Sequence, residues 1–217
     1  MTLLSTGSRM SAVSAHIPTA SEHMLETRID IELGQINLIS PIIEEEIDIY
    51  EVLTQSLAWR KDSIRIRGKL VDIPRLQAWY GEPHCVYTYS GLTMAPEPFP
   101  PILKHLRDIA QDKAGAPFNC VLCNWYRDGQ DSVGWHSDNE PELGNNPVIA
   151  SYSFGATRRF LIKPKKGNHR ASAIELPHNS LLIMGGAMQH HWNHQVPKTD
   201  KPVSGRINLT FRYIRNF

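Results

Sequence analysis

The sequence is poor in the features that mark several classes of protein. Its 217 residues include only three cysteines, Cys85, Cys120 and Cys123, which cannot all pair. We therefore expect a reducing compartment, cytoplasmic or, in a eukaryote, nuclear. No apolar run approaches the roughly 20 residues of a membrane-spanning helix, so no membrane partner is expected. With a net charge of +1 and 8% aromatic residues, the composition is that of an ordinary globular domain.

Positive charge is nevertheless concentrated in two stretches. One runs from Arg158 to Arg170 and contains no acid, and the other spans residues 60–75. Such stretches can contact the phosphates of a nucleic acid even on a nearly neutral protein. Solvated loops and strand faces would give the same pattern.

The chain divides into a short extension and one domain. Residues 1–28 are rich in Ser, Thr and Ala without a sustained period, and we expect them to be disordered. Residues 29–217 form the domain. An amphipathic helix is predicted after Ser40-Pro41, with Ile43, Ile47, Tyr50, Leu53 and Leu57 on one face. A second helix is predicted from Pro100-Pro101 to about Gly115.

From Phe118 onward the sequence changes to short β-type runs separated by turn residues. Strands are predicted at residues 119–126, 148–154, 159–163, 173–176, 180–184 and 206–214. Several short strands at this spacing are typical of a sandwich or barrel. The predicted fold class is therefore α+β, with helices that support a double-layered β core.

The last strand carries polar side chains on one face. Because side chains alternate along a strand, Arg206, Asn208, Thr210 and Arg212 share a face, and the residues between them are apolar up to Tyr213. Two guanidiniums beside an amide suit a small dianion with two carboxylates. An ordinary solvated face fits the pattern equally well.

The strand at 119–126 shows a similar alternation. Leu122, Asn124 and Tyr126 fall on one face, while Cys120 and Cys123 face opposite sides. Without a second cysteine pair, a zinc site is disfavoured and buried inert thiols are expected.

His136 and Asp138 form an HxD pair that can bind one metal ion. In an extended segment both side chains point the same way, and a second histidine would complete a set of two His and one carboxylate with open positions. The cluster at residues 189–194 offers His190, His191 and His194. From spacing alone, these are equally well polar residues of an exposed loop.

Taken together, the motifs resemble the AlkB family of nucleic-acid dealkylating dioxygenases, from about residue 65 to the end. The resemblance covers the following co-linear runs: Pro74-Arg75, 78–81, 87–90, Cys123-Asn124-x-Tyr126, 131–133, 135–141, 150–156 and 206–212. It implies a double-stranded β-helix (jelly-roll) core, with N-terminal helices and a nucleotide-recognition segment at about 62–97.

The resemblance also implies Fe(II), 2-oxoglutarate and O₂ as cofactor and co-substrates. His136, Asp138 and His194 would bind the iron, with His194 chosen because it precedes Val196-Pro197 and lies twelve residues before Arg206. Arg206 and Tyr126 would hold the distal carboxylate of 2-oxoglutarate. Arg212, Asn124 and Asn208 would hold its other end.

The activity implied is oxidative demethylation of 1-methyladenine and 3-methylcytosine in DNA, with release of formaldehyde, succinate and CO₂. The residues expected to contact substrate are Tyr87, Tyr89, Ser90, Glu140, Arg75 and Arg67. Glu140 would favour a cationic base, and the two tyrosines would line the base pocket unless they merely pack in the core.

The sequence departs from the family where duplex-acting members insert an aromatic finger. Arg67 stands at that position, so single-stranded DNA is favoured over duplex DNA. An RNA demethylase, a hydroxylase of proteins or small molecules, and a catalytically silent nucleic-acid-binding module are the alternatives. No apolar stripe remains for an interface, so a monomer is expected.

Overall fold

The computed structural model describes residues 19–44, 47–66, 68–89 and 92–215. Its strands are β1 (Leu25–Ile31), β2 (Gly34–Ser40), β3 (Ser63–Ile66), β4 (Lys69–Asp72), β5 (Leu76–Gly81), β6 (Tyr87–Tyr89), β7 (Leu92–Met94), β8 (Cys120–Tyr126), β9 (Val133–His136), β10 (Ile149–Gly155), β11 (Arg158–Pro164), β12 (Ser172–Leu176), β13 (Ser180–Gly186), β14 (Trp192–Val196) and β15 (Arg206–Arg212). The helices are α1 (Ile49–Ser56), α2 (Pro101–Ala114), the short α3 (Met188–His191) and the 3₁₀ turn η1 (Pro141–Leu143).

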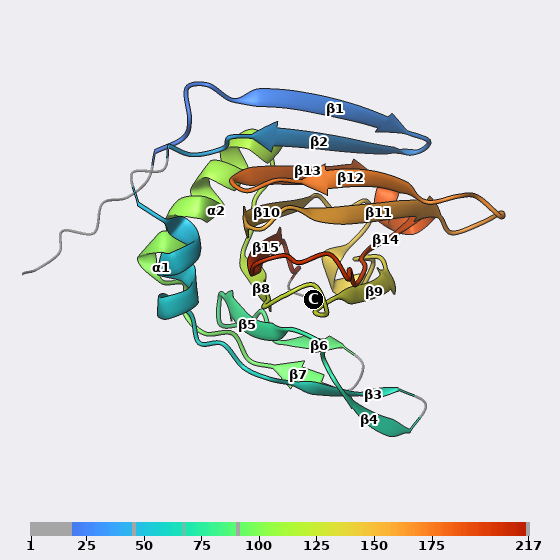
Figure 1. Ribbon diagram of the computed structural model, residues 1–217, viewed down its shortest axis with the longest axis horizontal. Coiled ribbons are helices and arrows are strands. Elements are labelled where there is room, and N and C mark those ends of the chain that lie inside the picture. The colour runs from blue at the N-terminus through green and yellow to red at the C-terminus, as the bar shows by residue number, and fades with distance from the viewer. Residues whose placement is uncertain (1–18, 45–46, 67, 90–91, 216–217) are drawn as a thin grey trace, which may run out of the picture.

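The strands form two main sheets and two hairpins. The major sheet has the order β1-β2-β13-β10-β15-β8-β5, and the minor sheet has the order β12-β11-β14-β9. Every pairing in both sheets is antiparallel. The two sheets face each other, whereas the hairpins β3-β4 and β6-β7 project below them (Figure 1). This arrangement confirms the predicted double-layered jelly-roll core.

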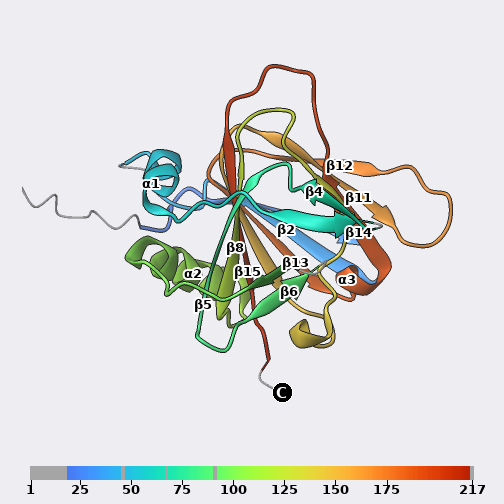
Figure 2. The same cartoon turned by 90° about the horizontal axis from the view of Figure 1, so that it is seen from below.

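Apolar side chains fill both faces of the major sheet. One cluster joins the sheet to α1 and α2 through residues such as Leu53, Leu106 and Phe211. The other lies between the two sheets and includes Leu122, Phe160 and Leu182. Figure 2 shows α1 and α2 on one side of the major sheet and the minor sheet on the other. The helices thus support the layer that carries β8 and β15.

The first predicted helix begins eight residues too early. Residues 42 and 43 are not helical, because Asn179 Oδ1 accepts their backbone N–H groups at 3.2 and 3.1 Å. Helix α1 starts only at Ile49, where Asp48 caps it by accepting the Glu51 N–H at 3.1 Å. The second helix is confirmed, since α2 runs from Pro101 to Ala114 with Gly115 as its left-handed C-cap.

The predicted boundary at residue 28 falls inside strand β1. Residues 25–28 pair with β2 in a regular antiparallel register. Their side chains are exposed, because β1 is an edge strand, and a strand that buries neither face shows no apolar period. The prediction for residues 1–18 lies outside the described residues. Within the described ranges, every helix falls short of the length and apolar character that a membrane crossing requires.

Candidate active site

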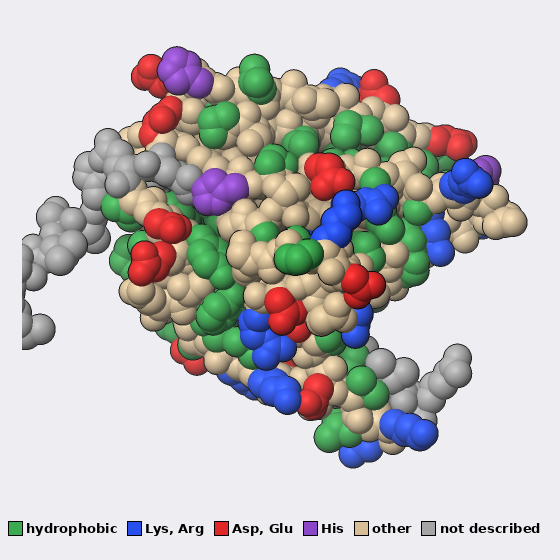
Figure 3. Space-filling view, viewed as in Figure 1, with side chains coloured by type: hydrophobic (Ala, Val, Ile, Leu, Met, Phe, Trp, Pro, Cys, Tyr) green, Lys and Arg blue, Asp and Glu red, His purple; other side chains and the backbone are tan. Residues whose placement is uncertain are grey.

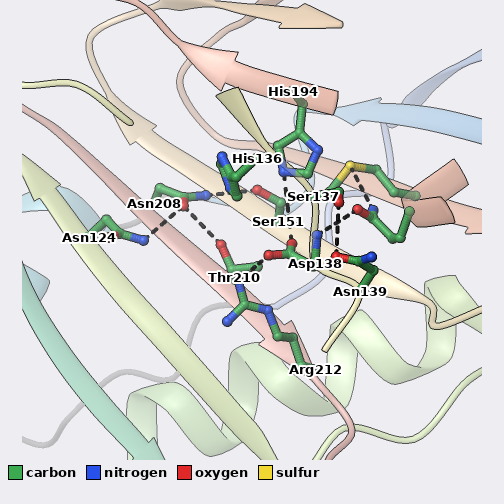
Figure 4. A network of polar contacts seen from close by, with 12 residues as sticks. Asn124, His136, Ser137, Asp138, Asn139, Ser151, His194, Asn208, Thr210 and Arg212 are labelled. Carbon is green, nitrogen blue, oxygen red and sulfur yellow. Dashed lines mark hydrogen bonds and ion pairs between the residues drawn. The ribbon is translucent and has the colours of Figure 1, made fainter. Parts of the chain in front are cut away.

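Two neighbouring, paired strands of the minor sheet bring the predicted metal ligands together. His136 ends β9 and pairs directly with His194 of β14, so both imidazoles point into the space between the sheets. With Asp138 they form a group whose ligand atoms all lie within 4.8 Å of one another. The two imidazole ring centroids are 4.3 Å apart, and His194 Nε2 lies 3.9 Å from Asp138 Oδ2. Figure 4 shows the three side chains converging.

Neighbouring groups set the protonation states of these ligands. His136 Nδ1 lies 2.8 Å from the carbonyl oxygen of Gly134, which can only accept, so Nδ1 is the donor of this contact and Nε2 is the nitrogen left to bind a metal ion. Burial lowers the pKa of His194 to about 3, so this imidazole is neutral at pH 7. Burial opposes ionisation of Asp138, but Arg212, His194 and His136 outweigh it and bring its pKa below the ordinary value. Two imidazoles and one carboxylate are a donor set that suits iron(II).

The predicted co-substrate residues line a small cavity beside this group. Its volume is about 60 Å³, and its walls include Asn124, Tyr126, Arg206, Asn208 and Arg212 together with the three metal ligands. The alternation predicted for β15 is confirmed, since Ile207, Leu209 and Phe211 lie on the opposite face in the helix-side core. The alternation in β8 is confirmed as well, because Cys120 and Cys123 belong to separate apolar clusters on the two faces of the sheet.

Arg206 is suited to an anion. Its Nη2 donates to Ser153 Oγ at 2.8 Å, but its Nε and Nη1 are buried without a hydrogen-bond partner in the described part of the chain. The guanidinium lies 5.2 Å from the centroid of the Tyr126 ring. A carboxylate placed in the cavity would accept from the two orphaned N–H groups, so the residues present fit the distal end of 2-oxoglutarate.

The other polar side chains of the cavity bind one another. Asn208 Nδ2 donates to Ser151 Oγ at 2.8 Å and to the Tyr152 carbonyl oxygen at 2.9 Å, and Thr210 Oγ1 donates to Asn208 Oδ1 at 2.9 Å. Arg212 Nη2 donates to Asp138 Oδ1 at 2.8 Å. Arg212 therefore fixes a metal ligand as well as lining the co-substrate cavity (Figure 4).

Three supporting residues were not predicted from the sequence. Ser151 and Ser153 pair with Thr210 and Asn208 across β10 and β15, and their alternation with apolar neighbours could have placed them on the cavity face. Gln189 is 1% exposed and accepts the Asp138 N–H at 2.9 Å. No pattern in the sequence indicated this contact, since it joins positions 51 residues apart.

A larger cavity of about 420 Å³ adjoins the metal group. It is bounded by residues 71–75, Ile64, Leu122, residues 133–138, Glu140 and Arg212. Of the residues predicted to contact substrate, Arg75 and Glu140 line it. Arg75 is turned towards the core, where its Nε donates to Asn124 Oδ1 at 2.6 Å. Tyr87 and Tyr89 belong to β6, but their side chains, together with Ser90 and Arg67, lie outside what the structure describes.

A jelly roll with two histidines and one aspartate between its sheets, beside an arginine-lined cavity, defines an iron(II)- and 2-oxoglutarate-dependent oxygenase. The model of the 2OG-Fe(II) oxygenase superfamily matches residues 37–212. Human alpha-ketoglutarate-dependent dioxygenase alkB homolog 3 is 43% identical over 181 residues, covering 79% of this chain and 63% of that protein. Mouse DNA oxidative demethylase ALKBH2 is 39% identical over 179 residues, covering 79% and 72%. The protein of the same name from Arabidopsis thaliana is 30% identical over 234 residues, covering 94% and 74%.

The chain therefore belongs to the AlkB family of this superfamily. Its cofactor and co-substrates are iron(II), 2-oxoglutarate and O₂, and His136, Asp138 and His194 form its metal site. The solved structure of OsALKBH1 shares the fold, with a TM-score of 0.63 at 17% identity, covering 86% of this chain and 100% of that one. The chain spans 63% of the length of human alkB homolog 3.

Proposed function

We propose that this protein oxidatively removes methyl groups from alkylated bases of DNA, with single strands favoured over duplexes. The observation that carries the proposal is the pair of adjoining cavities. The metal ligands His136 and Asp138 line both cavities. The smaller one, of about 60 Å³, is lined by the buried Arg206 and Arg212, and the larger one, of about 420 Å³, has mostly apolar walls. Two relatives named DNA oxidative demethylase, at 39% and 30% identity, support a DNA substrate.

The residues of the small cavity would hold the cofactor and the co-substrate. His136, Asp138 and His194 would bind iron(II), Arg206 and Tyr126 the distal carboxylate of 2-oxoglutarate, and Arg212, Asn124 and Asn208 its other end. When bound, iron(II), 2-oxoglutarate and O₂ supply hydroxylation of the alkyl carbon, with succinate and CO₂ as by-products. The hydroxymethyl group then leaves the base nitrogen as formaldehyde. The electrons of the broken N–C bond return to the nitrogen, which neutralises the cationic base, and the hydroxyl proton is released.

The larger cavity would hold the damaged base. Glu140 lies in its wall, and a carboxylate there favours a base that carries positive charge, as 1-methyladenine and 3-methylcytosine do. Only a single-stranded or flipped-out base can enter such a pocket. The sequence has Arg67 between β3 and β4, where an aromatic residue would be expected for insertion into a duplex, so a single strand is the favoured form.

The test is demethylation of single-stranded oligonucleotides that contain 1-methyladenine or 3-methylcytosine. Protein loaded anaerobically with iron(II) is mixed with 2-oxoglutarate and air, and oligonucleotide mass, formaldehyde and succinate are followed. We expect loss of one methyl mass with wild type and no loss with His136→Ala. His191→Ala, which alters an exposed histidine outside the metal group, is the matched control and should retain activity.

Two outcomes would contradict the proposal in different ways. Succinate formation with intact DNA would retain the oxygenase chemistry and move the substrate to RNA, a protein or a small molecule. Absence of both turnover and iron binding would contradict an enzymatic role.

A further inference from the structure

Trp135, which lines the larger cavity, meets Lys163 on the outer face of the minor sheet. Strand β9 is the edge of that sheet. Because side chains alternate along a strand, His136 points into the site, whereas Trp135 points outward and is 37% exposed. Trp135 nevertheless lines the larger cavity, as do its neighbours Gly134 and His136. An exposed indole thus lies one residue away from a metal ligand.

Lys163 reaches Trp135 across an intervening strand. It lies on β11 opposite Asn193 of β14, and β14 in turn pairs with β9. Its Nζ is 4.2 Å from the centroid of the Trp135 ring. Within the described residues no carboxylate lies within 4.0 Å of this ammonium, whereas Arg159 on the same strand pairs with Glu175 at 3.8 Å. Lys163 therefore keeps a charge that an anion could take up.

We propose that Trp135 and Lys163 form a subsite for the nucleotide next to the target base in a single strand. The neighbouring base would stack on the indole, and a backbone phosphate would form an ion pair with the ammonium of Lys163. This inference rests on the proposed function and adds to it a second point of contact along the strand.

Interaction energies favour replacing the Lys163–Trp135 contact by a base stacked on Trp135 and a phosphate paired with Lys163. An exposed cation–π contact is weaker than the stacking of a base on an aromatic side chain, so a base can displace the ammonium from the ring. Because the stem of a lysine is flexible, the ammonium group can swing from the ring to a nearby phosphate. A duplex would keep the neighbouring base paired and stacked, so the subsite favours single strands.

The surface around this pair leaves room for a strand. A side chain built on Gly134 would meet no atom within 4 Å, so the backbone beside Trp135 is open to a ligand. Figure 3 shows the molecule hollowed between the β3-β4 hairpin and the minor sheet. Trp135 belongs to the minor-sheet side of this hollow, and Ile64 and Val71 of the hairpin line the same cavity.

The test uses binding and turnover of two single-stranded oligonucleotides. One carries 3-methylcytosine between normal nucleotides, and the other carries it between abasic nucleotides, which keep the phosphates but remove the neighbouring bases. We expect Trp135→Ala to weaken binding about tenfold with the first oligonucleotide and less than twofold with the second. Trp135→Phe, which keeps an aromatic ring, should bind the first within threefold of wild type.

Lys163→Gln should behave differently from the tryptophan variants. It should weaken binding of both oligonucleotides and lower the salt dependence of log Kd by about 0.7, the loss of one phosphate contact to a single strand. Tyr213→Ala, a change at another exposed aromatic residue, and Lys104→Gln, on exposed α2 surface, are the matched controls and should match wild type. Iron content and succinate formed without DNA should be unchanged in all variants.

The result that would overturn the subsite is a Trp135→Ala defect of equal size on both oligonucleotides, or no defect on either. An unchanged salt dependence in Lys163→Gln would overturn the role of the lysine. Wild-type protein that binds both oligonucleotides without demethylating them would contradict the proposed function alone, because anisotropy of a labelled strand measures the subsite independently of turnover.

Discussion

At the scale of the single residue, Arg206 combines a stability cost with a binding role. It is 1% exposed, and burial lowers its pKa to about 10. No carboxylate in the described ranges lies within 4.0 Å of it. Burying an ion costs desolvation free energy that only a paired charge and hydrogen bonds offset, so replacing an unpaired buried charge with an apolar side chain of similar size is expected to be neutral or stabilising. Arg206 is therefore better explained by the proposed binding of a carboxylate than by folding.

We predict that Arg206→Met separates these two effects. Without ligand, its melting temperature should equal or exceed that of wild type. Wild type should be stabilised by 2-oxoglutarate through mass action, whereas the variant should show no rise at the same concentration. Differential scanning fluorimetry with and without 2-oxoglutarate, at fixed metal, gives both values. A variant that melts far below wild type would instead assign Arg206 a structural role.

At the residue scale, the two-residue alternation of side chains along a strand was enough to predict which residues share a face. Alternation in β15 placed Arg206, Asn208, Thr210 and Arg212 on one face, and all four line the small cavity. Spacing alone did not decide which of His190, His191 and His194 is the second histidine ligand of the metal. The structure selects His194 because it pairs with His136, while His190 Nε2 accepts the Asn146 N–H at 3.3 Å. The pairing of β9 with β14 is a long-range register, and a single sequence carries no local signal for it.

At the scale of the element, one buried arginine joins two loops behind the co-substrate cavity. Arg158 begins β11 and donates to the carbonyl oxygens of Asp128, Asp131 and Pro197 at 3.0, 3.0 and 2.7 Å. Its guanidinium also lies 5.8 Å from the centroid of the Tyr126 ring. The loop after β8 and the loop after β14 are thereby held together, next to the ring that Arg206 contacts from 5.2 Å.

Arg158→Met should lower the free energy of unfolding by about 2–4 kcal/mol, because three carbonyl groups, one in a buried and two in part-buried hydrogen bonds, lose a charged donor. Arg159→Met is the matched control. The Arg159 side chain is 61% exposed and its ion pair with Glu175 is loose, so a change within about 0.5 kcal/mol is expected. Urea denaturation followed by tryptophan fluorescence measures both. Equal effects of the two substitutions would show that the loops do not depend on Arg158.

The misplaced start of α1 shows why element boundaries are hard to predict. The apolar pattern at Ile43 and Ile47 continues the spacing of the true helix, and Ser40-Pro41 looks like a helix start. The structure uses these residues otherwise, since Asn179, 136 positions away from Ile43, supplies backbone contacts through its side chain. A distant polar partner outweighs local helical preference here, and only tertiary structure reveals it.

At the scale of the whole molecule, the core and the β3-β4 hairpin have different roles. The two apolar clusters draw their buried members from the two main sheets, α1, α2, α3, β7 and adjoining segments, and neither includes a described side chain of β3 or β4. The described side chains of β4 are all exposed. Yet Ile64 and Val71, which face each other across this hairpin, line the larger cavity. The described side chains of the hairpin therefore line the larger cavity without being buried members of the core.

Removal of the hairpin should consequently separate folding from substrate recognition. We predict that replacing residues 64–71 with Gly-Gly, which joins the paired residues Ser63 and Asp72, changes the melting temperature by only a few degrees. Iron content and succinate formation without DNA should persist, because the metal group and Arg206 lie between the sheets. Demethylation of a single-stranded oligonucleotide should fall at least a hundredfold, since one wall of the base pocket is gone. Retained demethylation would place base recognition in β9 and Glu140 alone, whereas a collapse in melting temperature would make the hairpin part of the folding unit.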